Sequence, residues 1–296
     1  MDDGGRRLSP TGDLAFKKLL GSEDHKAVIQ GFISDFFSVE VGVDEIRIEN
    51  PYSISPVDVI KDGEELRRLQ ETFRDVTLAV NVADVIIEMQ LHVGRFFTQR
   101  SVYYLCDRFV GHYSKTVVEG ERGLDYRYAP LRPVYALNIV GESFRDGPNA
   151  LHMFQLFDSV LKEAMVPDLL RVGYFELGKT GGLSPVQRLW RDFLLSGEAP
   201  VGAPGYIVEA AKMMEYVNLG REERDMVDVL EKANATWEAQ ILYAEDRGFE
   251  KGREQGKAAE ARLVAGRMLA RGMDRTTVSE VTGLSLDELG RINADT

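Results

Sequence analysis

The sequence predicts an α/β protein whose mixed sheet is flanked by helices and followed by a helical C-terminal region. The first observation is a set of segments with strand-like alternation or apolar, β-branched composition at residues 85–91, 134–140 and 172–177. The second is the helical spacing of apolar residues between these segments. Strands interleaved with helices are typical of a layered α/β domain. After Ser184-Pro185 the patterns become helical.

Length and composition are those of an ordinary globular protein. A chain of 296 residues can bury a full core. No apolar run is long enough to span a membrane, and the polar N-terminus lacks the apolar segment of a signal peptide. The single cysteine, Cys106, excludes an internal disulfide and a Cys-based zinc site. We therefore expect a cytoplasmic protein with no membrane partner.

The net charge of −12 argues against a protein that coats nucleic acid non-specifically, because neutralising phosphates requires clustered Lys and Arg. It does not exclude a nuclease. A local groove and a bound metal ion can outweigh the average charge of the chain.

The N-terminal region predicts a disordered segment over residues 1–9 and two amphipathic helices, 13–20 and 26–37. Asp13 either caps the first helix or contributes a carboxylate to a metal site, and an Asp before an amphipathic run favours the cap. Lys17 and Lys18 are expected to be solvated, although a phosphate could meet them.

The next part of the chain predicts a strand at 46–48, an irregular stretch containing Pro51 and Pro56, and a surface turn or short helix at 61–71. A hairpin over 73–91 follows and turns at Asn81 to Ala83.

Asp75 and Glu88 are symmetric about the Asn81-Val82 junction of this hairpin. In a tight hairpin they lie opposite each other, with Cα atoms about 4.5 to 5.5 Å apart and both side chains on one face. Gln90 shares that face. Two opposed carboxylates repel, and a divalent cation between them removes the conflict because Mg²⁺ prefers one or two carboxylates completed by water and phosphate.

Residues 96–113 predict an amphipathic helix. Arg100 and Tyr104 fall on its polar side, where they are either solvated or hold a phosphate or the site carboxylates. Cys106 lies in the expected buried stripe and is interpreted as a small buried hydrophobe. That stripe consists of Val102, Leu105, Cys106, Phe109 and Tyr113.

Three further strands are predicted as buried, at 134–140, 152–157 and 172–177. Helices are then expected at 186–195, 208–217 and 226–243, with a linker at 197–205 that is rich in Gly and Pro. We expect an α/β domain over 10–180, a helical region over 181–245 and a helical tail over 246–296.

The tail predicts a helix at 262–269, a helix capped by Asp274 and ended by Gly283, and a last helix that starts with a Ser285/Glu288 capping box. Residues 247–275 carry eight Lys/Arg against four Asp/Glu. Three short helices with a glycine turn are compatible with a helix-turn-helix. The acidic first turn of the last helix instead favours packing or homo-oligomerisation through these helices.

The hairpin residues resemble a known nuclease signature. Asp75 followed by Ile-Glu88-Met-Gln90 is similar to the Asp…Glu-x-Lys pattern of the PD-(D/E)XK nuclease superfamily, in the Glu-x-Gln form of its recombination-promoting nuclease (Rpn-type)/transposase branch. Ser9-Pro-Thr-Gly-Asp-Leu-Ala-Phe-Lys-Lys resembles the opening segment of that branch, and Arg100 with Tyr104 resembles its Arg-x-x-x-Tyr helix.

The later parts of the chain extend the resemblance. Residues 132–140 and 174–179 lie where the family has later core strands, and the Gly-spaced, charged tail ending in Thr282-Gly-Leu-Ser-Leu-Asp-Glu-Leu289 is similar to the family's tail. The resemblance implies a restriction-endonuclease-like fold and a metal-dependent DNA endonuclease linked to recombination or mobile DNA. A transposase of the RNase H type is less expected, since its distributed acidic triad is not found along the chain.

The resemblance also implies roles for individual residues. Asp75 and Glu88 would hold one or two Mg²⁺ ions, or another hard divalent cation, with the backbone carbonyl of Met89 as a further ligand. Gln90 stands where the wider superfamily has Lys; it cannot carry charge or act as a base, so it can only orient water or phosphate. Arg100, Tyr104, Asp13 and Lys17 would bind substrate phosphate or support the site.

Three alternatives remain open at this stage. His92 is either a base or donor beside Glu88 or, more commonly, a polar residue at a strand end. The hairpin carboxylates could be structural, with Asp75 paired to Arg74 or Arg100 and Glu88 facing solvent on an edge strand. The whole chain could be a catalytically silent nuclease-like module that binds DNA or protein, and such a module should bind no metal at the hairpin.

Overall fold

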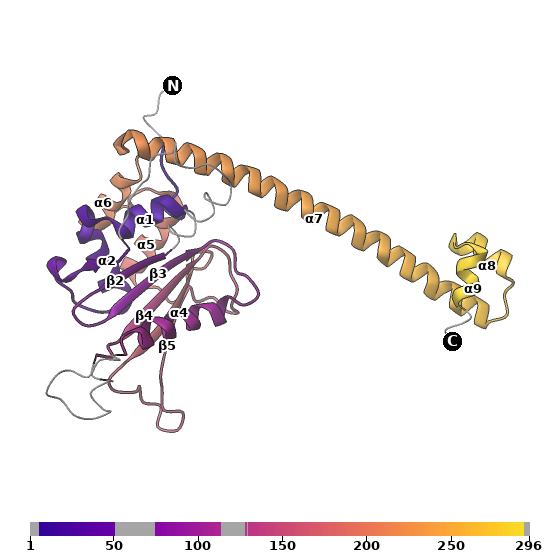
Figure 1. Ribbon diagram of the computed structural model, residues 1–296, viewed down its shortest axis with the longest axis horizontal. Coiled ribbons are helices and arrows are strands. Elements are labelled where there is room, and N and C mark those ends of the chain that lie inside the picture. Colours follow the sequence, from indigo (N-terminus) through magenta and orange to yellow (C-terminus); the bar gives the residue numbers. More distant parts are fainter. Residues whose placement is uncertain (1–5, 51–74, 114–127, 129, 293–296) are drawn as a thin grey trace. The chain divides into compact units, whose positions relative to one another are not determined.

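The computed structural model describes residues 6–50, 75–113, 128 and 130–292 (Figure 1). The side chain of Asp75 and those of several α7 residues are not among those described. The chain divides into two compact units, Met1–Val227 and Asp228–Thr296, which are described separately. The segments predicted around Pro51, Pro56 and 61–71 lie outside the described residues.

In the described part of the chain, six strands form one mixed sheet, which confirms the predicted fold class. Their order is β1-β2-β3-β4-β6-β5. Neighbouring strands are parallel at β3/β4 and β4/β6, and antiparallel at the other pairings. The strands are β1 (Arg47–Ile48), β2 (Asp75–Ala79), β3 (Asp84–Gln90), β4 (Val134–Val140), β5 (Leu151–Gln155) and β6 (Leu170–Glu176).

The strands differ in burial according to their place in the sheet. β4 is central, and each of its residues is buried, as its largely apolar composition predicts. β5 was also predicted to be buried, and that prediction is wrong. It is an edge strand, and its residues are half-buried or exposed because it has a neighbour on one side only.

Helices cover both faces of the sheet (Figure 1). On one face, Phe36 and Phe37 of α2 pack against Phe175 and Tyr135. On the other face, Phe97 of α4 packs against Tyr174. The helices of this unit are α1 (Asp13–Gly21), α2 (Lys26–Phe37), α4 (Phe97–Gly111), α5 (Pro185–Ser196), α6 (Gly205–Met213) and the first residues of α7 (Arg221–Ala270), with short 3-10 turns at Glu23–His25, Val43–Glu45 and Tyr216–Asn218.

Of the segment predicted to be disordered at 1–9, the described residues 6–9 are ordered. The Leu8 side chain is buried, and its backbone N–H donates to Met214 at 2.8 Å. Arg7 forms a bridge with Glu215. These partners are about 200 residues away in sequence, so local composition could not reveal them.

The first helix also corrects three predictions. Gly12, not Asp13, occupies the N-cap position, and Asp13 is the first residue of α1. Lys17 is buried at 1% exposure, and Lys18 pairs with Glu223 at 2.6 Å, so neither is a solvated lysine. Long Lys side chains can bury their stems when the ammonium finds a partner.

Helix α4 is rotated relative to the prediction. Its buried residues are Phe97, Ser101 and Leu105, whereas Cys106 and Val102 of the predicted stripe are exposed. The physical reason is that Ser101 makes two buried hydrogen bonds, to Phe97 and Asn138. The polar Ser101, which has internal partners, is therefore buried in place of the neighbouring Val102 of the predicted stripe.

A single helix, α7, spans the segments predicted as separate helices at 226–243 and 262–269. Its glycines do not interrupt it. The caps of the last two helices are confirmed. Asp274 accepts from Thr277 before α8 (Arg275–Thr282), Gly283 ends α8 with φ of 70°, and Ser285 and Glu288 form the box at the start of α9 (Leu286–Ile292).

The second unit has its own small core. Ala265, Val278, Leu284 and Leu289 are buried together, and Met268 and Leu269 pack against them. Among the helices of the described residues, none combines the length and apolar character needed to cross a membrane.

Candidate functional site

The hairpin of β2 and β3 has the predicted register. Asp75 pairs with Glu88, and the turn closes with a hydrogen bond of 2.9 Å from Val80 N–H to the Ala83 carbonyl. β3 is not an edge strand, because β4 pairs with its other side and places Asn138 beside Glu88. The interpretation of Glu88 as a solvent-facing residue on an edge strand is therefore wrong, and its side chain is half-buried.

Polar residues form a row across one face of the sheet. Glu88 on β3 is the register partner of Asn138 on β4, which pairs with Tyr174 on β6. Tyr174 in turn pairs with His152 on β5. Paired residues of neighbouring strands project to the same face, and here that is the face covered by α4.

Glu88 lines a small cavity of about 10 Å³ under α4, which is roughly the room that one water molecule needs. Ser101, Tyr104 and Asn138 also line it. Of the two alternatives for Tyr104, a solvated side chain or one near the site carboxylates, the structure favours the second, since Tyr104 and Glu88 line the same cavity. Asp13 and Lys17 of α1 are not among the described residues that line this cavity.

Gln90 is held at both ends of its side-chain amide. Its oxygen accepts from Arg100 of α4, and its NH₂ group donates to the backbone carbonyl of His92 at 2.8 Å. His92 itself is mostly exposed, with Nδ1 3.8 Å from Glu142. The structure thus joins Gln90 and Arg100, and it leaves His92 at the strand end, where the commoner interpretation placed it.

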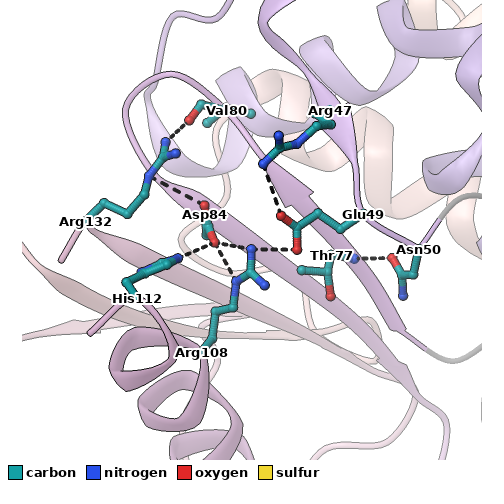
Figure 2. A network of polar contacts seen from close by, with 9 residues as sticks. All are labelled: Arg47, Glu49, Asn50, Thr77, Val80, Asp84, Arg108, His112 and Arg132. Carbon is teal, nitrogen blue, oxygen red and sulfur yellow. Dashed lines mark hydrogen bonds and ion pairs between the residues drawn. The ribbon is translucent and has the colours of Figure 1, made fainter. Parts of the chain in front are cut away.

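A network that the sequence did not predict lies at the other end of β3 (Figure 2). Asp84, 1% exposed, accepts from Arg108 and lies 2.9 Å from His112 Nε2 and 3.6 Å from Arg132 Nε. Arg108 also reaches Glu49 at 2.6 Å. The sequence offered one indication of this network, the charged Asp84 at the start of an apolar strand. Its partners Arg108 and His112 lie 24 and 28 residues away, so local patterns could not identify them.

The network connects α4 to the sheet through ion pairs between Arg108 and the carboxylates of Asp84 and Glu49. Arg108 lowers the pKa of Glu49 by hydrogen bonding to it. Arg100 meets Gln90 at the end of β3, whereas Arg108 meets Asp84 at its beginning, so α4 runs antiparallel to β3 and is held at both ends. Glu88 and Tyr104 lie between these two attachments.

The described residues contain no group of three or more His, Cys, Asp or Glu side chains that could hold a metal ion. The side chain of Asp75 lies outside that set. A hard cation such as Mg²⁺ does not need three protein carboxylates, because one or two together with water and phosphate are sufficient. The paired backbones of Asp75 and Glu88 and the half-buried Glu88 carboxylate therefore fit such an ion.

Two family models match the chain. Residues 10–189 match the family model described as PD-(D/E)XK nuclease family transposase. Residues 258–293 match the Rpn/YhgA-like nuclease family, C-terminal HTH domain. The second match supports the helix-turn-helix alternative for the tail. No curated protein and no solved structure matches the chain. Because the first match spans more than half of the sequence, the chain belongs to the PD-(D/E)XK nuclease family of transposases.

Proposed function

We propose that the protein is a metal-dependent endonuclease that hydrolyses phosphodiester bonds in DNA. The observation that carries the proposal is the register of the hairpin, which pairs Asp75 with Glu88 in the middle of the sheet of a PD-(D/E)XK family member. Like charges directly opposite each other destabilise a strand pair, and a cation bound between them would remove that cost.

Asp75, Glu88 and the backbone carbonyl of Met89 are the proposed ligands of Mg²⁺ or a similar hard cation. A bound divalent ion lowers the pKa of water and neutralises charge on a phosphate. The chain's own contribution is to fix Glu88: β2 and β4 hold its backbone on both sides, and α4 covers its side chain.

Gln90 has a role in this proposal that differs from that of a catalytic Lys. Its amide cannot accept a proton from water at neutral pH. It binds one end of the Arg100 guanidinium, which has five N–H donors, so the remaining donors can meet a phosphate oxygen. Tyr104, beside Glu88, supplies a hydroxyl near the same phosphate.

The test is cleavage of supercoiled and linear DNA with Mg²⁺ and with EDTA. We expect cutting by the wild type with Mg²⁺, loss of cutting with EDTA, and a rate at least about 100-fold lower in Asp75→Asn and Glu88→Gln. Asp107→Asn, an exposed acid on α4, is the matched control and should cut normally. Equal cutting by all variants would show that the hydrolytic site lies elsewhere.

A second function is favoured by one observation, the helix-turn-helix domain at 258–293. The protein would then be a catalytically silent nuclease-like module that binds DNA through its tail, and homo-oligomerisation through the C-terminal helices could accompany this. Titration with Mn²⁺ separates the two functions, because the silent module should bind DNA but show no metal binding that Glu88→Gln removes.

A further inference from the structure

A second polar cluster lies on the Glu88 face of the sheet, around Glu176 at the end of β6. Glu176 is fully buried. Its Oε2 accepts from the Phe144 N–H at 3.0 Å and lies 2.8 Å from Lys179 Nζ. Lys179 therefore neutralises the Glu176 carboxylate. A further cationic side chain in the cluster would give it a net positive charge.

The second member of the cluster is His152, whose buried Nε2 has no hydrogen-bond partner among the described residues. Its Nε2 lies 3.8 Å from Glu176 Oε1, and within the described part of the chain neither buried atom makes a hydrogen bond. The His152 side chain is 21% exposed, so the part of the ring away from the buried Nε2 reaches solvent. The buried Tyr174 hydroxyl beside it also lacks a hydrogen bond of normal geometry from the described residues.

Arg145 adds an uncompensated guanidinium. Its Cζ lies 4.8 Å from the centroid of the Phe154 ring, which holds the side chain by a cation–π contact. No carboxylate among the described residues lies within ion-pair distance of it. The Arg145 guanidinium is planar and is already positioned by the Phe154 ring. Its N–H donors can bind two oxygens of one phosphate.

The cluster lies at the far end of the row of paired residues that starts at Glu88. Glu88 pairs with Asn138, Asn138 with Tyr174, and Tyr174 with His152. Three strand spacings place His152 about 14 Å from Glu88. Phosphates of one DNA strand advance about 3.4 Å each along the helix axis, so this separation corresponds to about four nucleotides. Phe144, next to Arg145, also packs against Phe97 at the start of α4.

We propose that Arg145 and His152 form a binding site for a DNA phosphate about four nucleotides from the one at Glu88. This site rests on the proposed nuclease function, because it binds the same substrate outside the cleavage position. Two acids lie in the same loop. Glu142 already accepts from Val93 N–H, whereas Asp146 is exposed beside Arg145 and opposes the phosphate.

The experiment measures binding of the full chain to a fluorescent DNA duplex by anisotropy at several salt concentrations. Glu88→Gln is the background for all samples and prevents cutting. Arg145→Ala is expected to weaken binding about fivefold and to reduce the slope of log K against log salt by about 1. His152→Leu should weaken binding by a smaller factor, and Asp146→Asn should strengthen it.

Arg188→Ala is the matched control, because Arg188 is an exposed arginine on α5, the helix that packs with α2 on the opposite face of the sheet. Its affinity and salt slope should equal those of the background, and thermal unfolding should show that every variant is folded. The site is wrong if Arg145→Ala and His152→Leu both bind like Arg188→Ala, or if the background does not bind the duplex. Failure of the nuclease function appears separately, as cleavage that Glu88→Gln does not reduce.

Discussion

Asp84 is a buried carboxylate that contacts three basic side chains. Its carboxylate is almost fully removed from water and is surrounded by Arg108, Arg132 and His112 (Figure 2). Burying a charge is costly unless it is paired, and removing one partner of a buried pair leaves the others uncompensated. The arginines are about one-quarter to one-third exposed, so water recovers part of that loss.

We therefore predict that Asp84→Ala lowers the free energy of unfolding by about 3 kcal/mol, the lower end of the range for broken buried pairs. Asp107→Ala, which removes an exposed acid next to Arg108, should change it by less than about 0.5 kcal/mol. Urea denaturation of both variants checks this. Equal midpoints for the two variants would mean that the network contributes no net stability.

At the scale of secondary structure elements, the hairpin was predictable, whereas for α4 the extent was predictable and the buried side was not. The pairing of Asp75 with Glu88 follows from a tight turn and the two-residue period, which are both local. The buried side of α4 depends on Asn138 and Asp84, which lie on other elements and meet Ser101 and Arg108 only in the fold. A prediction from the spacing of apolar residues assigns such polar residues to the exposed side, and it therefore assigned the wrong side of α4 to the core.

The same argument applies to the row from Glu88 to His152. Its residues come from four strands, which are aligned by two parallel pairings and one antiparallel pairing between segments distant in sequence. The sequence alone could place Glu88 and Gln90 on one face of β3, and the family resemblance could suggest Tyr104. It could not show that Asn138 and Tyr174 share the site, because nothing local in their segments distinguishes them from ordinary core residues.

The orientation of α4 has a direct chemical test in Cys106. The protein has one cysteine, and the structure exposes it. We predict that a thiol reagent modifies native Cys106 at a rate within about tenfold of the unfolded chain, because an exposed thiol needs no opening of the fold. Leu105→Cys in a Cys106→Ser background is the matched control, since Leu105 is only 4% exposed. The assigned rotation of α4 fails if Cys106 is the protected thiol.

On the scale of the whole molecule, charge is distributed unevenly. The chain carries a net charge of −12, yet residues 247–275 have an excess of four positive charges. This segment leads into the helix-turn-helix domain matched at 258–293. DNA affinity that depends on phosphate contacts requires such a local excess, because the average charge of the chain repels the duplex. The acidic first turn of α9 partly opposes it, although Glu288 is engaged in the capping box.

We predict that the double variant Arg271→Gln/Arg275→Gln reduces the salt slope of duplex binding by about 2, because each exposed arginine would release one phosphate counterion. Asp287→Asn should act in the opposite direction and raise affinity, since it removes an exposed acid from the start of α9. Anisotropy titrations at several salt concentrations measure both effects, with Glu163→Gln in the first unit as the control for a change of charge elsewhere. If the double variant binds like wild type while Arg145→Ala binds more weakly, the nuclease unit carries the DNA contact and the helix-turn-helix has another partner.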